Sequence, residues 1–358
     1  TLTSSLPLNP PSESTLTLCN RMLKTTALVA AIAATANASA TEEIRNVSSP
    51  SVTSFLVMGD WGGQDSPPFT TAAETATAAG MGKIAASASA TFGLALGDNF
   101  YSYGVKNVQD PRFQGTFEKV FTADSLQSPS FQFNVIAGNH DHRGNVTAQV
   151  AYSGVSERWE FPSLYYTFTE GDVQFVMIDT VVLAGNSDLE DGTELTGSNL
   201  PGPGEYAEEA ISQMAWINKT LAASTAKYLI VAGHYPVYSI CEHGPTSQLQ
   251  EQLKPLLEKY RVNAYMNGHD HCAQMIQTSG DAVQYHTIGS AHLNNPSTDH
   301  LSTLPSSSDL KFHTGTGQGG FASVHVNNDG DMHGGMTVVH RDGDGTVLYT
   351  APTMSPRF

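Results

Sequence analysis

Positively charged residues are scarce in this chain of 358 residues. Lys and Arg together number 17 against 34 Asp and Glu, which gives a formal net charge of −17 at neutral pH. All charged residues make up only 14% of the chain, whereas about 25% is usual in soluble domains. An acidic surface repels nucleic acid phosphates and anionic lipids, so we expect neither nucleic acid nor a membrane as a partner.

The N-terminal hydrophobic run is too short to cross a membrane. It extends from Ala27 to Ala36, about half of the ~20 residues that a spanning helix needs. A lysine precedes it and small residues up to Ala40 follow, a pattern typical of a secretory signal peptide. We therefore predict an upstream extension at 1–21 and a signal peptide at 22–40, with a mature protein that is secreted or delivered to a lysosome or vacuole. The alternative is a disordered tail rich in Ala, Ser and Thr.

Cysteine is scarce as well, with one residue before the predicted cleavage site, Cys19, and two after it. The two that remain, Cys241 and Cys272, form an even pair in an oxidising compartment, which favours a disulfide; two free buried thiols are the alternative. Secretion is supported independently by Asn-x-Ser/Thr sequons. These sequons predict N-linked glycans at Asn46, Asn145 and Asn218.

From about Val52 onward, apolar runs typical of strands alternate with helical segments at about 70–90, 205–224 and 247–260. This alternation predicts an α/β sheet. The last part of the chain changes to short alternating runs separated by Asp-Gly turns, which favours antiparallel strands. The predicted strands lie within TSFLVMGDWGG (53–63), TFGLALGDNFY (91–101), QFNVIAGNHDH (132–142), VQFVMIDT (173–180), AKYLIVAGHYP (226–236) and VNAYMNGHDHC (262–272).

Polar side chains follow immediately after five of these apolar runs. Each of the five runs stops at a glycine, which lets the backbone turn sharply and come close to a ligand. In α/β sheets, ligands bind beyond the carboxyl ends of the strands, so we expect these side chains to converge. One such strand end would be an ordinary turn, but five alike indicate function. The residues are Asp60, Asp98, Asn139, His234 and the pair His269 and His271.

The residue types favour metal ions over a nucleophilic side chain. The chain has no Gly-x-Ser-x-Gly elbow, no P-loop and no cysteine clearly beside a base. The strand-end residues and the nearby Tyr101 supply oxygen and imidazole donors, enough for two ions that share a bridging carboxylate. His269 and His271 are two residues apart in a segment expected to be extended, so they should project to the same side. Two-metal sites recur in enzymes that hydrolyse phosphate esters.

The motifs and their order resemble the purple acid phosphatases, and most closely the small single-domain form typified by mammalian tartrate-resistant acid phosphatase. The motifs are GDWG at 59, GDNFY at 97, GNHD at 138, AGHYP at 232 and GHDH at 268, and the likeness extends to RFQGTFEKVF, DTVVLAGNSD and EHGPT. The resemblance implies an α/β fold of the metallophosphoesterase type, a β-sandwich flanked by helices in α/β/β/α layers. It also implies one catalytic domain at about 51–350, without the N-terminal β domain of the larger plant members. The acidic segment 185–209 and the two cysteines depart from the mammalian pattern.

The resemblance also implies a role for each ligand. A phenol has a pKa of ~10 and ionises in acid only beside a strongly acidic cation, so Tyr101 indicates a trivalent metal. Two imidazoles and an amide oxygen suit Fe(II), Zn or Mn about equally, so the identity of the divalent ion stays open. The implied assignment is Asp60, Tyr101 and His271 on Fe(III), Asn139, His234 and His269 on the divalent ion, and Asp98 bridging the two.

Two further histidines, His140 and His243, resemble the noncoordinating active-site histidines of the family. They are expected to hold phosphate oxygens and to protonate the leaving alkoxide, a task that suits a group with a pKa of ~6.5. His142, considered as the partner of Asp141, is expected to be structural. Surface or loop positions are expected for His286, His292, His313 and the C-terminal histidines, which carry no spacing signal.

Together these observations predict a secreted, iron-dependent acid phosphatase that hydrolyses phosphate monoesters of small molecules or phosphoproteins, with a metal-bound hydroxide as nucleophile. One alternative is a dinuclear metal phosphodiesterase of the same superfamily. A noncatalytic alternative is a secreted glycoprotein that sequesters metal or phosphate. The intact ligand set and His140 weigh against the noncatalytic alternative.

Overall fold

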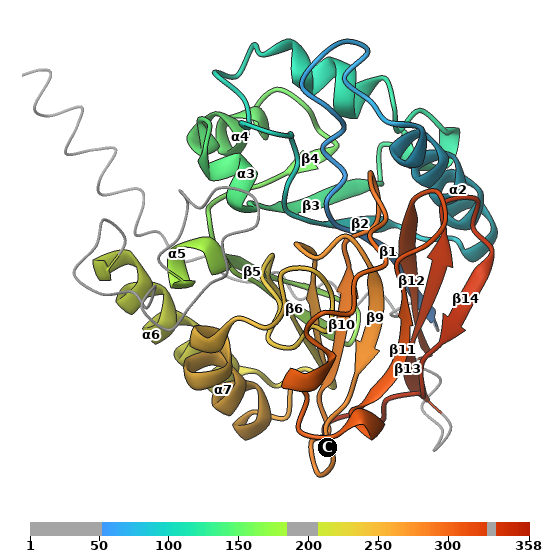
Figure 1. Cartoon of the computed structure of the whole chain (residues 1–358). Helices are drawn as coiled ribbons and strands as arrows, with labels where there is room; N and C mark the ends of the chain where they lie inside the picture. Colours follow the sequence, from blue (N-terminus) through green and yellow to red (C-terminus); the bar gives the residue numbers. More distant parts are fainter. Residues whose placement is uncertain (1–51, 185–206, 328–333) are drawn as a thin grey trace, which may run out of the picture. The chain divides into compact units, whose positions relative to one another are not determined.

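Each apolar run that the sequence predicts as a strand forms a largely buried strand in the computed structural model (Figure 1). The structure describes residues 52–184, 207–327 and 334–358. The predicted upstream extension, the signal peptide, the Asn46 sequon and nearly all of the acidic segment 185–209 lie outside the described residues.

The first sheet is parallel on one side of its central strand β1 and antiparallel on the other. Phe55 of β1 pairs in parallel register with Phe92 of β2 and in antiparallel register with Val324 of β12. Parallel pairing needs a long crossover, which α2 provides between β1 and β2, whereas a tight turn at 343–346 joins the antiparallel strands β13 and β14. In spatial order the strands are β14 (Val347–Thr350), β13 (Gly335–Asp342), β12 (Gly320–Asn327), β1 (Val52–Met58), β2 (Phe92–Leu96), β3 (Gln132–Ile136) and β4 (Trp159–Glu160).

The second sheet has a parallel centre and antiparallel edges. Strands β6, β7, β8 and β10 run parallel to their neighbours in this group, while β5 and β9 pair antiparallel to β6 and β10. The parallel centre is almost entirely buried because both of its faces are covered. In spatial order the strands are β11 (Leu310–Thr314), β9 (Ala273–Ile276), β10 (Gln284–Ile288), β8 (Ala264–Asn267), β7 (Tyr228–Ala232), β6 (Val173–Met177) and β5 (Tyr166–Glu170).

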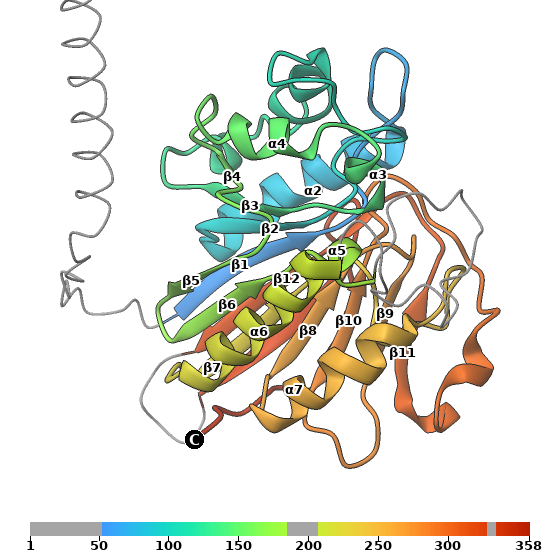
Figure 2. The ribbon, with the colours of Figure 1, turned by 90° about the vertical axis from the view of Figure 1, so that its left-hand side faces the viewer.

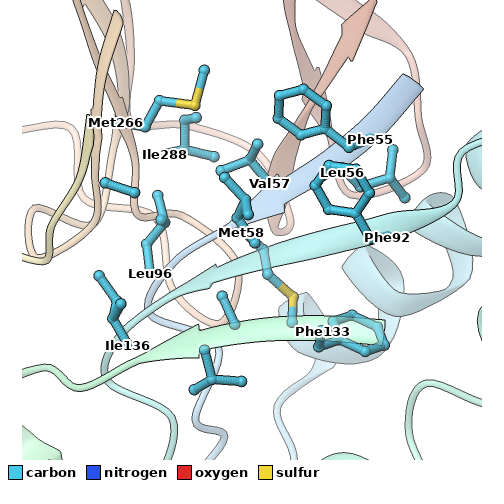
Figure 3. Packing of buried hydrophobic residues seen from close by; sticks show 14 of the residues in the cluster. Phe55, Leu56, Val57, Met58, Phe92, Leu96, Phe133, Ile136, Met266 and Ile288 are labelled. Carbon is cyan, nitrogen blue, oxygen red and sulfur yellow. The ribbon is translucent and has the colours of Figure 1, made fainter. Parts of the chain in front are cut away.

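The two sheets pack face to face around buried aromatic and aliphatic side chains. Phe55 of the first sheet stacks on Phe92 with ring centroids 5.0 Å apart and meets the edge of Phe175, from the second sheet, at 5.1 Å. Figure 3 shows part of this cluster, to which the second sheet also contributes Met266 and Ile288. Burying each such side chain contributes about 1.5–3 kcal/mol, so this contact is a major source of stability.

Helices cover the outer faces of both sheets, which gives the predicted α/β/β/α layers (Figure 2). Helix α2 begins after Thr71, whose hydroxyl accepts from the Glu74 backbone N–H while the Glu74 carboxylate accepts from the Thr71 N–H. It packs on β1 and β12, and α6 packs Ile217 and Leu221 with Leu229 of the second sheet. The α-helices of the described residues are α2 (Ala72–Ala88), α3 (Asn139–His142), α4 (Val146–Tyr152), α5 (Thr180–Ala184), α6 (Ala207–Ala223) and α7 (Lys254–Lys259).

The structure bears on the predicted modifications and on membrane association. Cys241 and Cys272 form a disulfide, which confirms the predicted pairing. Of the sequon residues, Asn145 and Asn218 have exposed side chains. Within residues 52–184, 207–327 and 334–358, none of the helices has the length and hydrophobicity needed to cross a membrane.

Candidate metal centre

The seven predicted ligands come together beyond the carboxyl ends of parallel strands from both sheets. The ligand atoms of Asp60, Asp98 and His234 lie within 4.8 Å of one another, and all three side chains are buried. Contacts among the seven side chains divide them into two groups with Asp98 between. Asp60 follows β1, Asp98 and Tyr101 follow β2, Asn139 follows β3, His234 follows β7, and His269 and His271 follow β8.

Asp60, Tyr101 and His271 form the first group. The Tyr101 hydroxyl lies 2.9 Å from Asp60 Oδ1 and 3.0 Å from His271 Nε2. His271 Nε2 lies 3.7 Å from Asp60 Oδ1. A carboxylate, a phenol and an imidazole therefore direct one donor atom each toward a common point.

Asn139, His234 and His269 form the second group. His234 Nε2 lies 3.1 Å from Asn139 Oδ1, and the His234 and His269 ring centroids are 5.2 Å apart. His234 Nδ1 lies 2.8 Å from the Leu96 carbonyl oxygen. Because a carbonyl only accepts, Nδ1 carries the hydrogen, and Nε2 faces the site as a metal-ligating histidine requires.

Asp98 lies between the two groups. Its Oδ1 lies 3.4 Å from His234 Nε2 and accepts the His140 backbone N–H at 3.0 Å. The side chain is almost completely buried, with its ligand atoms within 4.8 Å of those of Asp60 and His234. Asp98 is therefore close to members of both groups.

The glycines that precede the ligands are required by close approach of the backbone. Gly97, before Asp98, has a φ of 92°, and a Cβ there would lie 2.7 Å from His234 Nδ1. A Cβ on Gly138, before Asn139, would lie 2.2 Å from Asp98 Oδ1. A larger residue at either position would displace a ligand, so these glycines make room for the site.

The reason for expecting His269 and His271 on one side was wrong, although both face the site. The segment is bent and not extended, and His269 has a φ of 71° in the left-handed region. The His269 N–H donates to Asp60 Oδ2 at 2.7 Å, which holds the bend. The bend directs His269 toward His234 and His271 toward Tyr101.

Burial makes the charges of the carboxylates depend on the surrounding groups. Burial raises the pKa of Asp60 well above its ordinary value, and the nearby Asp98 carboxylate adds to this. Burial alone would raise the pKa of Asp98 too, but His234 and His140 hold it well below its ordinary value. Burial lowers and Asp98 raises the pKa of His234, which comes to about 9. The buried carboxylates of Asp60 and Asp98 thus attract positive charge, so this site favours a cation.

Burial favours the neutral form of the remaining titratable donors. Burial lowers the pKa values of His269 and His271 well below that of ordinary histidine, so both retain a lone pair for a metal. Burial raises the pKa of Tyr101 well above that of an ordinary phenol, and Asp60 adds to the rise. Ionising this phenol requires a strongly acidic cation. The donor set and its burial therefore fit bound metal ions.

His140 and His243 border the two ligand groups. His140 Nδ1 donates to the Ser102 carbonyl at 2.8 Å, and its Nε2 lies 3.9 Å from Asp98 Oδ2. The His243 ring stacks on His269 with centroids 4.3 Å apart, and its backbone N–H donates to Asp270 Oδ1 at 2.7 Å. Both histidines therefore lie within reach of a group bound at the ligands.

Two expectations about other histidines need correction. His142 is structural, but its partner is Asp179, at 2.7 Å, and not Asp141. His286 is neither on the surface nor in a loop: it is fully buried in β10 and lies 3.0 Å from the equally buried His340. The two histidines come from strands β10 and β13 of different sheets, a contact that sequence spacing does not reveal.

Sequence reasoning missed two residues that contact the ligand loops. The His292 ring stacks on Tyr101, and the Arg112 guanidinium donates to the carbonyls of Tyr101 and Gly62. A signal for His292 was present, because the run before it also stops at a glycine, Gly289, three residues earlier. Arg112 opens RFQGTFEKVF, a stretch used only as evidence of likeness.

Comparison with known proteins places this site in a family. The family model for calcineurin-like phosphoesterases matches residues 53–273. Tartrate-resistant acid phosphatase type 5 of Oryctolagus cuniculus is 44% identical over 303 residues, which cover 82% of this chain and 89% of that protein. Purple acid phosphatase 3 of Arabidopsis thaliana is 32% identical over 87% of this chain and 81% of that protein. The chain belongs to the purple acid phosphatase family.

The predicted family, fold class and enzyme class are thereby confirmed, and this purple acid phosphatase is an enzyme of the acid phosphatase type. Among solved structures, GAP50, the anchor in the inner membrane complex of Plasmodium, superposes with a TM-score of 0.67 at 23% identity. The match covers 86% of this chain and 90% of that one. At this identity it bears on the fold alone.

Proposed function

We propose that this purple acid phosphatase hydrolyses phosphate monoesters at a dinuclear centre of Fe(III) and a divalent ion. The observation that carries the proposal is the division of seven buried or partly buried donors into two contact groups with Asp98 between them. The proposed Fe(III) ligands are Asp60, Tyr101 and His271. The proposed ligands of the divalent ion, which is Fe(II), Zn or Mn, are Asn139, His234 and His269.

When bound, such ions supply positive charge for the phosphate oxygens and acidify a water molecule so that hydroxide is available in acid. The chain's own residues prepare this site. His234 keeps its Nε2 toward the site because its Nδ1–H is held by the Leu96 carbonyl. Asp60 is kept in place by the His269 N–H, and Asp98 by the His140 N–H.

His140 and His243 are proposed to act on the ester itself. The Nδ1–H bond of His140 to Ser102 leaves Nε2 as the atom that carries a proton to a departing alkoxide. His243 is held from its backbone by Asp270 and lies over His269, so its ring can contact a phosphate oxygen beside the second ligand group. Protonation of the departing alkoxide should speed the hydrolysis, in acid, of monoesters whose alkoxide is a poor leaving group.

We further propose that the chain is made with a signal peptide at 22–40 and is secreted or delivered to a lysosome or vacuole, with N-glycans on Asn46, Asn145 and Asn218. The Cys241–Cys272 disulfide supports an oxidising compartment. The exposed side chains of Asn145 and Asn218 are accessible to glycosylation. N-terminal sequencing of protein from its natural host should give a start close to Thr41, and a start at or before Met22 would contradict the signal peptide.

The metal assignment is tested by elemental analysis and visible absorption of the purified protein. A Tyr101 phenolate on Fe(III) transfers charge to the metal in visible light, so the oxidised protein should be violet to pink. Tyr101→Phe should abolish the colour while the fold survives. Tyr103→Phe is the matched control, because Tyr103 is 69% exposed and close in sequence, and it should leave the colour unchanged. A colourless, fully active protein without iron would refute the metal assignment.

The substrate class is tested on the same metal-defined protein. Turnover of a phosphate monoester should exceed that of a diester with the same leaving group, with a maximum in acid. Faster turnover of the diester would favour the phosphodiesterase alternative. Binding of metal and phosphate without turnover of either ester would favour the noncatalytic alternative.

A further inference from the structure

His292 lies against the first ligand group. Its ring stacks on the Tyr101 ring with centroids 4.1 Å apart and planes 29° from parallel. It meets the His271 ring edge-on, at 5.1 Å and 89°. In the part of the chain that the structure describes, the other rings within contact of Tyr101, those of His140 and His271, meet it edge-on. His292 is thus the ring that packs on the face of the Tyr101 phenol.

The His292 ring is held firmly in this position. Its backbone N–H and its Nδ1–H both donate to the carbonyl oxygen of Asp60, at 3.0 and 2.8 Å. The Nδ1 hydrogen is required there, because a carbonyl only accepts. The His292 carbonyl in turn accepts the Thr71 hydroxyl at 2.8 Å. With backbone and ring both anchored, the ring cannot turn away from Tyr101 without breaking a hydrogen bond.

The same two hydrogen bonds bear on Asp60. Asp60 has a φ of 56°, in the left-handed region, which costs a non-glycine residue about 1–3 kcal/mol and persists only when surrounding contacts enforce it. The Asp60 N–H donates to the Gly97 carbonyl at 3.0 Å, and its own carbonyl accepts from His292. His292 therefore fixes the backbone of one ligand and the ring of another.

We propose that His292 is a positioning residue for the proposed iron ligands: its ring fixes the orientation of the Tyr101 phenol, and its Nδ1–H fixes Asp60. The inference rests on the proposed function, because it concerns how the two side chains meet a trivalent ion. His292 acts through Tyr101 and Asp60 and is not itself assigned contact with substrate. The stacked ring is the part that sets the geometry of the phenol.

Three variants separate the two contacts. His292→Phe keeps a ring that can stack on Tyr101 but cannot donate to Asp60. His292→Asn keeps a short polar side chain without a ring, and His292→Ala removes both. Leu293→Ala is the matched control, because Leu293 is the next residue in the same loop and its side chain is 48% exposed.

The measurements are the visible absorption spectrum at equal iron content and the affinity for Fe(III) in competition with a chelator. In His292→Ala we expect a shifted and broader band and an affinity about 10- to 100-fold lower, the usual effect of losing a partner that orients a metal ligand. His292→Asn should shift the band similarly. His292→Phe should keep the wild-type absorption maximum, although its affinity is reduced. Thermal unfolding of each metal-free variant shows whether it is folded.

The outcomes distinguish this inference from the proposed function. A wild-type protein with no iron and no visible band refutes the metal assignment and this inference with it. A coloured wild type whose band and iron affinity are unchanged in His292→Ala overturns this inference alone. A second result would also overturn it: His292→Phe is folded but loses the wild-type absorption maximum, while His292→Asn retains it. In that case the stacked ring would not determine the orientation of the Tyr101 phenol.

Discussion

Removing the Cys241–Cys272 disulfide should strongly destabilise the fold. The bond joins residues 31 apart in sequence, and in the chain-entropy model a loop of this length stabilises the folded state by about 3–4 kcal/mol. Since the free energy of unfolding of a domain is typically about 5–15 kcal/mol, this is a large share. The loss should be seen in a double variant, Cys241→Ala with Cys272→Ala. Alanine is preferable to serine because both side chains are fully buried and a serine hydroxyl would need a partner.

The assay is equilibrium unfolding in urea of the metal-free protein, with wild type under nonreducing conditions as reference. Wild type that is kept reduced, without alkylation, gives a second estimate of the same change. The effect should extend to metal binding, because Cys272 directly follows His271 and Cys241 lies two residues before His243. A decrease in the free energy of unfolding below about 1 kcal/mol would refute the loop-closure reasoning. Peptide mapping that finds both thiols free in the purified protein would remove its premise.

Three further substitutions test how buried groups support the site and the fold. Asp98→Asn should lose both metals and nearly all activity, measured by elemental analysis and turnover. The control Asp172→Asn, which removes a carboxylate from a surface ion pair, should lose neither. Retention of two metals by Asp98→Asn would contradict a bridging role. Arg112→Lys should lower the free energy of unfolding by at least about 2 kcal/mol and speed metal loss to a chelator, because lysine cannot hold the Tyr101 and Gly62 carbonyls together. Arg158→Lys is the control, because it also removes hydrogen bonds to backbone carbonyls, but at a position far from the ligands in sequence. It should lower the free energy of unfolding without speeding metal loss. Equal rates of metal loss in the two variants would argue against a specific role of Arg112. Burial raises the pKa of Glu74 to about 9, so the contribution of its protonated form to stability is complete below pH about 4.5 and is lost as pH rises through 9. In this window the free energy of unfolding of Glu74→Gln should rise, relative to that of wild type, by about 1 kcal/mol per pH unit. A difference between the two proteins that does not vary with pH would disprove the shift.

The convergence of the candidate ligands could be predicted from the sequence because its signal is local. Each ligand follows an apolar strand and a glycine, and the carboxyl ends of parallel strands meet at one edge of the fold. Asp98 and Asn139 show this directly, since the glycine before each leaves room for a neighbouring ligand. Local patterns also predicted the strands and the helical segment at about 70–90 that contains α2, while the even pair of cysteines favoured the disulfide.

The residues that support the ligands could not be predicted in this way, because their roles depend on contacts between distant segments. Arg112 reaches two carbonyls that its own position in sequence does not indicate, and His142 pairs with Asp179 instead of its neighbour. His286 and His340 meet only because their strands belong to facing sheets. For such side chains, burial and partner are properties of the packed structure.

The sequence by itself thus determined which donor atoms gather at the proposed metal centre, because donor type and strand-end position can be read along the chain. The family resemblance already implied how these atoms divide into two groups. Only the tertiary structure decided why His269 and His271 face different neighbours and which groups hold them. The physical reason is that a donor's orientation depends on hydrogen bonds and stacking from other segments. His292, 232 residues from Asp60 and 191 from Tyr101 by number, reaches both only because β10 ends beside β1 and β2 in the folded chain.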